Sequence, residues 1–298
     1  MSHDPNDSAA EVTRARWRPR AGRLTRRFLR NRTGMAALAI LMMILIIAAV
    51  SVVWTPHDPT ASELTRRLEG PSGDHWLGTD NLGRDLLSRL MVATRVAVTA
   101  TAQAVGLAFF VGVPLGLVAG YIRGPLDAVL SRFSDTLLSL PPLIFAVAIV
   151  GSLGRGLTNA MVAIGVVLMP RFFRLARAAT QELREMTFVE AARASGTRTP
   201  SILAVHVLPN ISSPLLVQIS FGASVAIIAE SGLSFLGLGA QPPTASWGSL
   251  LKEGFDRLAE TNWHIWPPSV MIVLAILVLS LIGDALRDAI GRQTATER

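Results

Sequence analysis

Long uncharged stretches alternate with charged ones along this chain. Six windows contain no Asp, Glu, Lys or Arg: residues 33–56, 96–122, 136–154, 156–170, 207–229 and 265–283. A helix rises about 1.5 Å per residue, so about 20 residues cross the roughly 30 Å of hydrocarbon in a bilayer. The fourth window is short, but Arg155 and Arg171 flank it and can extend to the interfaces. The pattern predicts an all-α integral membrane protein with six spans.

Composition and charge support this prediction. Hydrophobic residues fill 50% of the 298 positions and the mean hydropathy is positive, which exceeds a typical soluble domain. A net charge of +7 would suit nucleic acid, but the basic residues follow the spans instead. Nine arginines precede the first span: Arg14, Arg16, Arg18, Arg20, Arg23, Arg26, Arg27, Arg30 and Arg32. The positive-inside rule then places the N-terminus in the cytoplasm, and six spans return the C-terminus there.

The spans divide the chain into five predicted regions. These are a basic cytoplasmic segment at 1–34, an N-terminal transmembrane helix at 35–54, an extracytoplasmic segment at 55–92, a five-helix core at 93–288 and a cytoplasmic tail at 289–298. The first apolar run is longer than a signal-peptide core and starts deep in the chain, so we expect a retained anchor.

The longest polar interruption in the membrane-spanning half is residues 187–210. Thr187 followed by Glu190 is typical of a capping box, and Gly196 stands where a left-handed residue would end a short helix. Thr199 before Pro200 predicts a second helix start. We therefore expect a helix, a turn and a second helix that leads into a span. Because apolar runs flank the segment, a docking surface for protein is favoured over recognition of nucleic acid.

This segment resembles the EAA loop of bacterial ABC-transporter permeases. The residues that carry the resemblance are Glu190, Ala191, Ala192, Arg193, Gly196, Leu208 and Pro209. His206 departs from the family's usual isoleucine but is similar to the His-x-Leu-Pro-Asn form of the peptide and nickel permeases. In that family the loop forms coupling helices that sit in a groove of the ATP-hydrolysing subunit. The resemblance implies the same role for a cytoplasmic coupling loop at 180–208.

Three further stretches resemble the peptide and nickel permeases: LGTDNLGRD at 77–85, SDTLLSLPPLIFAVAIV at 134–150 and ESGLSFLGLGAQPPTASWG at 230–248. They follow the family's order within about residues 70–290. The resemblance implies a type I ABC importer permease fold in the bacterial inner membrane. It also implies a homologous second permease in a heterodimer, two ATP-binding subunits and an extracytoplasmic binding protein. Dipeptides, oligopeptides, nickel, glutathione and other small solutes all remain open as substrates.

Unusual residues within the spans are candidates for the translocation pathway or its gate. They are Pro141, Pro142, Glu230, Ser231 and Gly237. The paired prolines must break the helix near the inner leaflet, either to expose carbonyls to a pathway or as a simple kink. A carboxylate at a span end is costly unless paired or wetted, so Glu230 is a relay, a substrate contact or an interfacial acid.

Three glycines of the second span, Gly112, Gly116 and Gly120, are spaced by four residues. Residues at that spacing lie on one helix face, and small side chains there let two helices approach closely in lipid. Close packing is favoured over a gate hinge.

No catalytic residue, metal site or cofactor is predicted. The chain has no cysteine, and the spacing within His75–Arg89 fits neither an EF-hand nor a zinc helix, which favours a structural role. Lys252, the only lysine, follows Leu251 rather than glycine, so the chain has no P-loop and a separate chain must hydrolyse ATP. The rival hypothesis is a proton- or ion-coupled carrier that uses Asp135 and Glu230.

Overall fold

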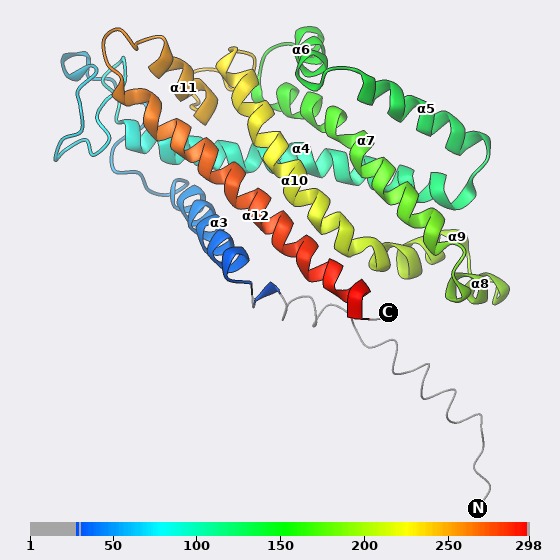
Figure 1. Ribbon diagram of the computed structural model, residues 1–298. Coiled ribbons are helices and arrows are strands. Elements are labelled where there is room, and N and C mark those ends of the chain that lie inside the picture. The colour runs from blue at the N-terminus through cyan, green and yellow to red at the C-terminus, as the bar shows by residue number, and fades with distance from the viewer. Residues whose placement is uncertain (1–27, 30, 297–298) are drawn as a thin grey trace, which may run out of the picture.

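The computed structural model describes residues 28–29 and 31–296, and the regular elements in this part are helices (Figure 1). In chain order they are α3 Arg32–Val50, the 3-10 turn η1 Leu64–Arg66, α4 Leu86–Ile122, α5 Pro125–Ser139, α6 Pro142–Leu153, α7 Leu157–Leu183, α8 Thr187–Ala194, α9 Thr199–Ser201, the π-helical turn η2 Ile202–Val207, α10 Leu208–Phe235, α11 Trp247–Phe255, the 3-10 turn η3 Trp263–Ile265 and α12 Trp266–Thr296. The predicted basic segment at 1–34 lies almost entirely outside the described residues.

Five helical segments are long and apolar enough to cross a membrane. They are Arg32–Val50, Leu86–Ile122, Leu157–Leu183, Thr199–Phe235 and Trp263–Ile290. The pair α5 and α6 meets the same criterion only when taken together, and its two helices are bent by 98°. The all-helical membrane fold is confirmed, and the predicted six spans are reached when this bent pair counts as one.

The break in the third span lies at the end of α5 that is distant from α8. Asp127 in the first turn of α5 pairs with Arg177 near the end of α7 that leads to α8. Helix α5 has 15 residues and is therefore about 22 Å long, and its last residue, Ser139, lies at the end distant from this ion pair. The break therefore lies toward the α11 end of the molecule, away from the α8 end where the predicted inner leaflet would be (Figure 1).

The core is formed where α4, α6, α7 and α10 meet. Its fully buried side chains include Met161, Ile164 and Phe172 of α7, with Val150 of α6 and Ala226 of α10. α12 packs along α10, and α3 packs against α12 at the edge of the bundle. The predicted N-terminal helix is thus an outer element, and few of its apolar side chains are buried.

The helix that contains the second span is longer than its uncharged window. It starts at Leu86, ten residues before the window and inside the predicted extracytoplasmic segment 55–92. Asp85 caps it by accepting a hydrogen bond from the Ser88 N–H at 2.8 Å. At the other end of the chain, α12 runs through the predicted tail as far as Thr296.

The three stacked glycines of α4 lie directly against α7. A Cβ on Gly112 would be 2.7 Å from the Met169 carbonyl oxygen, and one on Gly116 would be 2.5 Å from that of Phe173. Gly120 stands in the same relation to the Arg177 carbonyl oxygen, at 2.6 Å. The predicted close packing is confirmed, because no larger residue fits where the two backbones meet.

A matched pair of substitutions on α4 tests this contact. Gly116→Ala should destabilise the chain by about 1–3 kcal/mol, since the added methyl group overlaps α7 backbone atoms. Gly106→Ala on the same helix meets no atom within 4 Å, and a gain of about 0.5–1 kcal/mol is expected from helix propensity. Thermal midpoints of the two variants in one detergent should separate, and equal midpoints would contradict the close packing.

Candidate functional site

The predicted helical hairpin is present, but its helix starts differ from the prediction. α8 begins at Thr187, and its N-cap residue is Met186, whose extended backbone makes no side-chain capping bond. Thr187 is already helical and therefore cannot cap its own helix, so the predicted capping box with Glu190 is wrong. α9 likewise begins with Thr199, with Arg198 as its N-cap residue. Thr199 was therefore also misassigned as a cap.

The end of α8 agrees with the prediction. Gly196 has a φ of +74°, the left-handed conformation that glycine adopts without strain. Its N–H donates to the Arg193 carbonyl at 3.0 Å, and the Thr197 N–H donates to that of Ala192 at 3.1 Å. This pair of bonds is the Schellman arrangement that ends a helix.

The second arm of the hairpin leads without interruption into a span. After α9 the chain makes the π-helical turn η2, in which the Leu208 N–H donates to the Leu203 carbonyl. α10 follows, with Leu208 and Pro209 in its first turn. Pro209 has no N–H to donate, so the wider turn lies where the regular α-helical ladder is interrupted.

One face of α8 is anchored in the core, while the opposite face is exposed. Val189 is fully buried, and Phe188 and Ala192 pack against the main hydrophobic cluster. Glu190 and Ala191 are exposed. One side of α8 is thus fixed to the core, while small and charged side chains lie exposed on the other side.

A tyrosine at the end of α4 joins α8 to the bundle. Tyr121 is the only tyrosine in the chain and is buried. The guanidinium carbon of Arg193 lies 5.4 Å from its ring centroid, and that of Arg184 lies 5.8 Å away. Both distances are within the range of cation–π attraction. Arg193 of the predicted coupling set therefore faces back toward the bundle.

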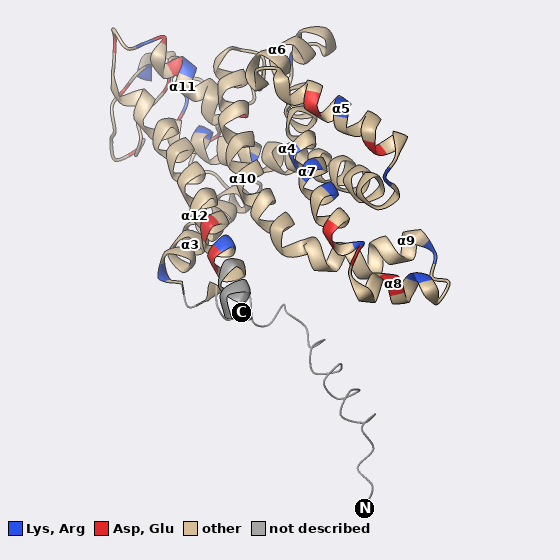
Figure 2. Cartoon of the chain, turned by 45° about the vertical axis from the view of Figure 1, so that its right-hand side comes forward, with Lys and Arg blue, Asp and Glu red and all other residues tan. Residues whose placement is uncertain are grey.

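Charged side chains gather around α8 and α9 at one end of the molecule, around α11 at the other, and along α5 (Figure 2). At the α11 end, Asp80 accepts a hydrogen bond from Arg84 Nε at 2.6 Å and another from Arg89. Arg89 also binds both carboxylate oxygens of Glu253 on α11. Asp80, Arg84 and Arg89 are buried. Asp80 and Arg84 of the 77–85 motif therefore belong to an ion network in which Arg89 attaches α4 to α11.

The candidate gate residues Glu230, Ser231 and Gly237 lie together at the last turns of α10. Glu230 is 1% exposed, and its Oε1 accepts a hydrogen bond from Ser234 Oγ at 2.7 Å. Ser234 Oγ also accepts from the Ala240 N–H at 3.1 Å, so the carboxylate holds the loop that follows α10. Gly237, with a φ of +76°, ends that helix.

Pro141 and Pro142 lie at the break between α5 and α6, and both are exposed. The neighbouring Leu143 approaches Gly232 of α10, with its Cδ1 3.8 Å from the position of an added Cβ. The two groups of candidate gate residues therefore lie at the same end of the molecule.

Sequence reasoning missed two residues that hold these ends of the molecule together, Glu253 and Tyr121. Glu253 lies 164 residues from Arg89, and no local pattern links them. Tyr121 ends an apolar run, and only the folded hairpin brings Arg193 over its ring. The single sign available was that Tyr121 is the chain's one tyrosine.

Comparison with known proteins extends over most of the chain. Residues 112–296 match the family described as the binding-protein-dependent transport system inner membrane component. Residues 21–71 match the N-terminal TM domain of oligopeptide transport permease C. Together the two matches include the hairpin, the gate candidates and the first span.

Curated relatives agree with both matches. The glutathione transport system permease protein GsiD of Pectobacterium atrosepticum is 38% identical over 89% of this chain and 88% of its own length. The dipeptide transport system permease protein DppC of Alkalihalophilus pseudofirmus is 37% identical over 88% of this chain and 86% of its own. Among solved structures, the MetNI methionine ABC transporter in an inward-facing conformation has a similar chain, with a TM-score of 0.55 and 19% identity over 67% of this chain and 96% of that one. At this identity the structural likeness supports the fold alone.

Proposed function

The chain belongs to the family of inner membrane components of binding-protein-dependent transport systems, and on this premise we propose that α8 couples its translocation pathway to an ATPase subunit. The protein is a multi-pass permease of a bacterial ABC importer from the peptide and glutathione group, and it is a transport component rather than an enzyme. Such an importer requires ATPase and binding-protein partners. Family membership removes the rival hypothesis of a proton- or ion-coupled carrier.

The exposed face of α8 is the single observation that carries the proposal. Glu190 and Ala191 are exposed on a helix whose other face is fixed to the core through Val189. A helix held in this way transmits a push to the spans, and alanine lets a partner's backbone approach closely. Gly196 ends the helix, while Leu208 and Pro209 begin the span that would receive the motion.

In this proposal the ATPase subunits close on ATP and displace α8. The hairpin connects α7 to α10 in the chain, so its displacement tilts both helices. This tilt opens the pathway toward the binding protein. The α8 end then faces the cytoplasm, and the loop with α11 faces outward. Both termini are cytoplasmic if α5 and α6 together count as one span.

The gate belongs, in the same proposal, to the end of the molecule that holds α11. Pro141 and Pro142 leave the helical ladder open there, and the carboxylate of Glu230 fixes the loop after α10 through Ser234. Glu230 then acts by holding Ser231, Gly237 and the following loop in place, since its carboxylate is buried among them.

Peptide is the proposed cargo, delivered by the extracytoplasmic binding protein to a heterodimer of this chain and a homologous permease. The similarity to permeases named for dipeptides supports this choice, while GsiD is named for glutathione, itself a small peptide. Nickel is a less favoured alternative.

Purification of the tagged chain in mild detergent tests the assembly. We expect a second permease and two ATP-binding subunits to co-purify, with ATPase activity in the same sample that a substrate-loaded binding protein stimulates. Peptides and nickel are then offered separately to the binding protein, and calorimetry identifies the cargo. Recovery of the chain without an ATPase, even after crosslinking in the membrane, would refute the proposal.

A further inference from the structure

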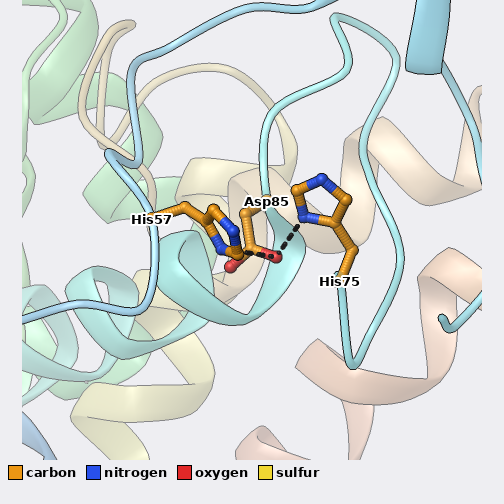
Figure 3. Close-up of side chains that lie close together, drawn as sticks. All are labelled: His57, His75 and Asp85. Carbon is orange, nitrogen blue, oxygen red and sulfur yellow. Dashed lines mark hydrogen bonds and ion pairs between the residues drawn. The ribbon is translucent and has the colours of Figure 1, made fainter. Parts of the chain in front are cut away.

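Two histidines converge on one carboxylate at the α11 end of the molecule (Figure 3). Nδ1 of His75 lies 2.8 Å from Oδ1 of Asp85, and Nδ1 of His57 lies 3.7 Å from the same oxygen. The two imidazole rings are 4.7 Å apart between centroids and tilted by 40°. At this distance His57 Nδ1 makes no hydrogen bond to the Asp85 oxygen.

We propose that His57, His75 and Asp85 form a binding site for a first-row divalent metal ion of the zinc, copper and nickel class. One ligand atom from each residue lies within 4.8 Å of the other two. Two ligand atoms on a tetrahedral zinc ion are about 3.3 Å apart, given metal–ligand bonds of about 2.0–2.2 Å. Side-chain shifts on the order of 1 Å therefore bring all three atoms to bonding distance.

The backbone around these side chains is already fixed. Ser88 Oγ donates to Asp85 Oδ2 at 2.6 Å and accepts the His57 N–H at 3.0 Å. Ser72 Oγ accepts the His75 N–H at 3.0 Å. Partners of this kind orient metal ligands and hold them in place. Three separate positions within residues 57–85 are thus held around one point before any ion binds.

The charge and exposure of the cluster suit a cation. The cluster places one carboxylate oxygen, Asp85 Oδ1, beside the two imidazole nitrogens. The His57 side chain is 43% exposed, which leaves a route to the ion from solution.

The ligand set selects the class of metal. Two imidazoles with one carboxylate suit zinc, copper or nickel, whereas magnesium and calcium prefer oxygen ligands throughout. A bound ion would join the segment after α3, the loop that contains His75 and the N-cap of α4. This site is independent of the transport role of α8, at the opposite end of the molecule (Figure 1).

Zinc binding to the detergent-purified complex tests the site. The complex carries a tag without histidine, is stripped with a chelator, and is titrated with Zn²⁺ by equilibrium dialysis and elemental analysis. We expect His57→Ala to lose one zinc equivalent per copy of this chain, or to bind it at least tenfold more weakly. Asp58→Asn is the matched control, because it removes an exposed carboxylate next to His57 that lies outside the cluster.

A second readout separates ligation from folding. Cu²⁺ bound to the wild-type complex should give an electron paramagnetic resonance spectrum with splitting from two imidazole nitrogens, and His57→Gln should leave splitting from one. Unchanged zinc affinity in both His57 variants, or unchanged nitrogen splitting, would overturn the proposal. Absence of zinc above the chelator-treated blank in the wild-type complex would overturn it as well.

Discussion

Gly196→Pro is expected to abolish uptake by the assembled transporter while the chain remains in the membrane. Gly196 adopts a φ of +74°, whereas proline is fixed near −65°. The substitution also removes the N–H that donates to the Arg193 carbonyl. The turn that ends α8 cannot form, so α8 and α9 lose their relative placement while the spans are left intact.

The measurement pairs uptake with ATP hydrolysis in proteoliposomes that contain the complex. We expect Gly196→Pro to lose uptake at least tenfold without a matching loss of hydrolysis by the ATPase subunits. Glu190→Pro should do the same, because it removes the N–H that donates to the Met186 carbonyl. Gly196→Ala is the matched control. Its methyl group meets no atom within 4 Å, and its left-handed strain of about 1–2 kcal/mol should leave most uptake. Normal uptake by either proline variant would refute the coupling role.

Arg89→Ala should have the largest effect on stability. The Arg89 side chain is 3% exposed and joins Asp80 to Glu253. Its removal leaves the buried Asp80 carboxylate with one fewer cation and disconnects Glu253 from α4. Loss of one partner from a buried ion pair costs about 3–5 kcal/mol.

Thermal unfolding and membrane yield measure this effect. Lys252→Ala is the matched control, because Lys252 forms an exposed ion pair with Asp256 on the same helix as Glu253, and such a pair contributes about 0–1 kcal/mol. We expect a clearly lower midpoint and yield for Arg89→Ala and little change for Lys252→Ala. Equal midpoints would show that the network does not attach α4 to α11.

The spans could be predicted because lipid-facing and core-facing residues are both apolar, so an uncharged window marks a crossing. The start of α4 could not be predicted, because Arg95 and Arg89 interrupt the uncharged pattern, and Arg89 is accommodated through Asp80 and Glu253. The 98° bend between α5 and α6 was visible only as a break. Prolines stop the backbone ladder, but neighbouring helices set the angle between the two pieces.

The hairpin illustrates the same limit at the scale of single residues. Gly196 was assigned correctly, since glycine alone adopts its conformation freely. The starts at Thr187 and Thr199 were each misplaced by one residue, because the extended cap positions are occupied by Met186 and Arg198, which are not among the preferred capping residue types. The roles of Glu230 and of the exposed face of α8 stay predictions.

Helix α4 is long enough to connect the α11 end of the molecule to the α8 end. Its 37 residues extend about 55 Å at 1.5 Å each. Arg89 in the first turn pairs with Glu253 of α11, and the guanidinium groups of Arg184 and Arg193 lie over the ring of Tyr121 in the last turn. The glycine contact holds α4 against α7 between these two ends. Under the proposed coupling, a displacement of α8 would therefore reach the α11 end through α4 and α7 together.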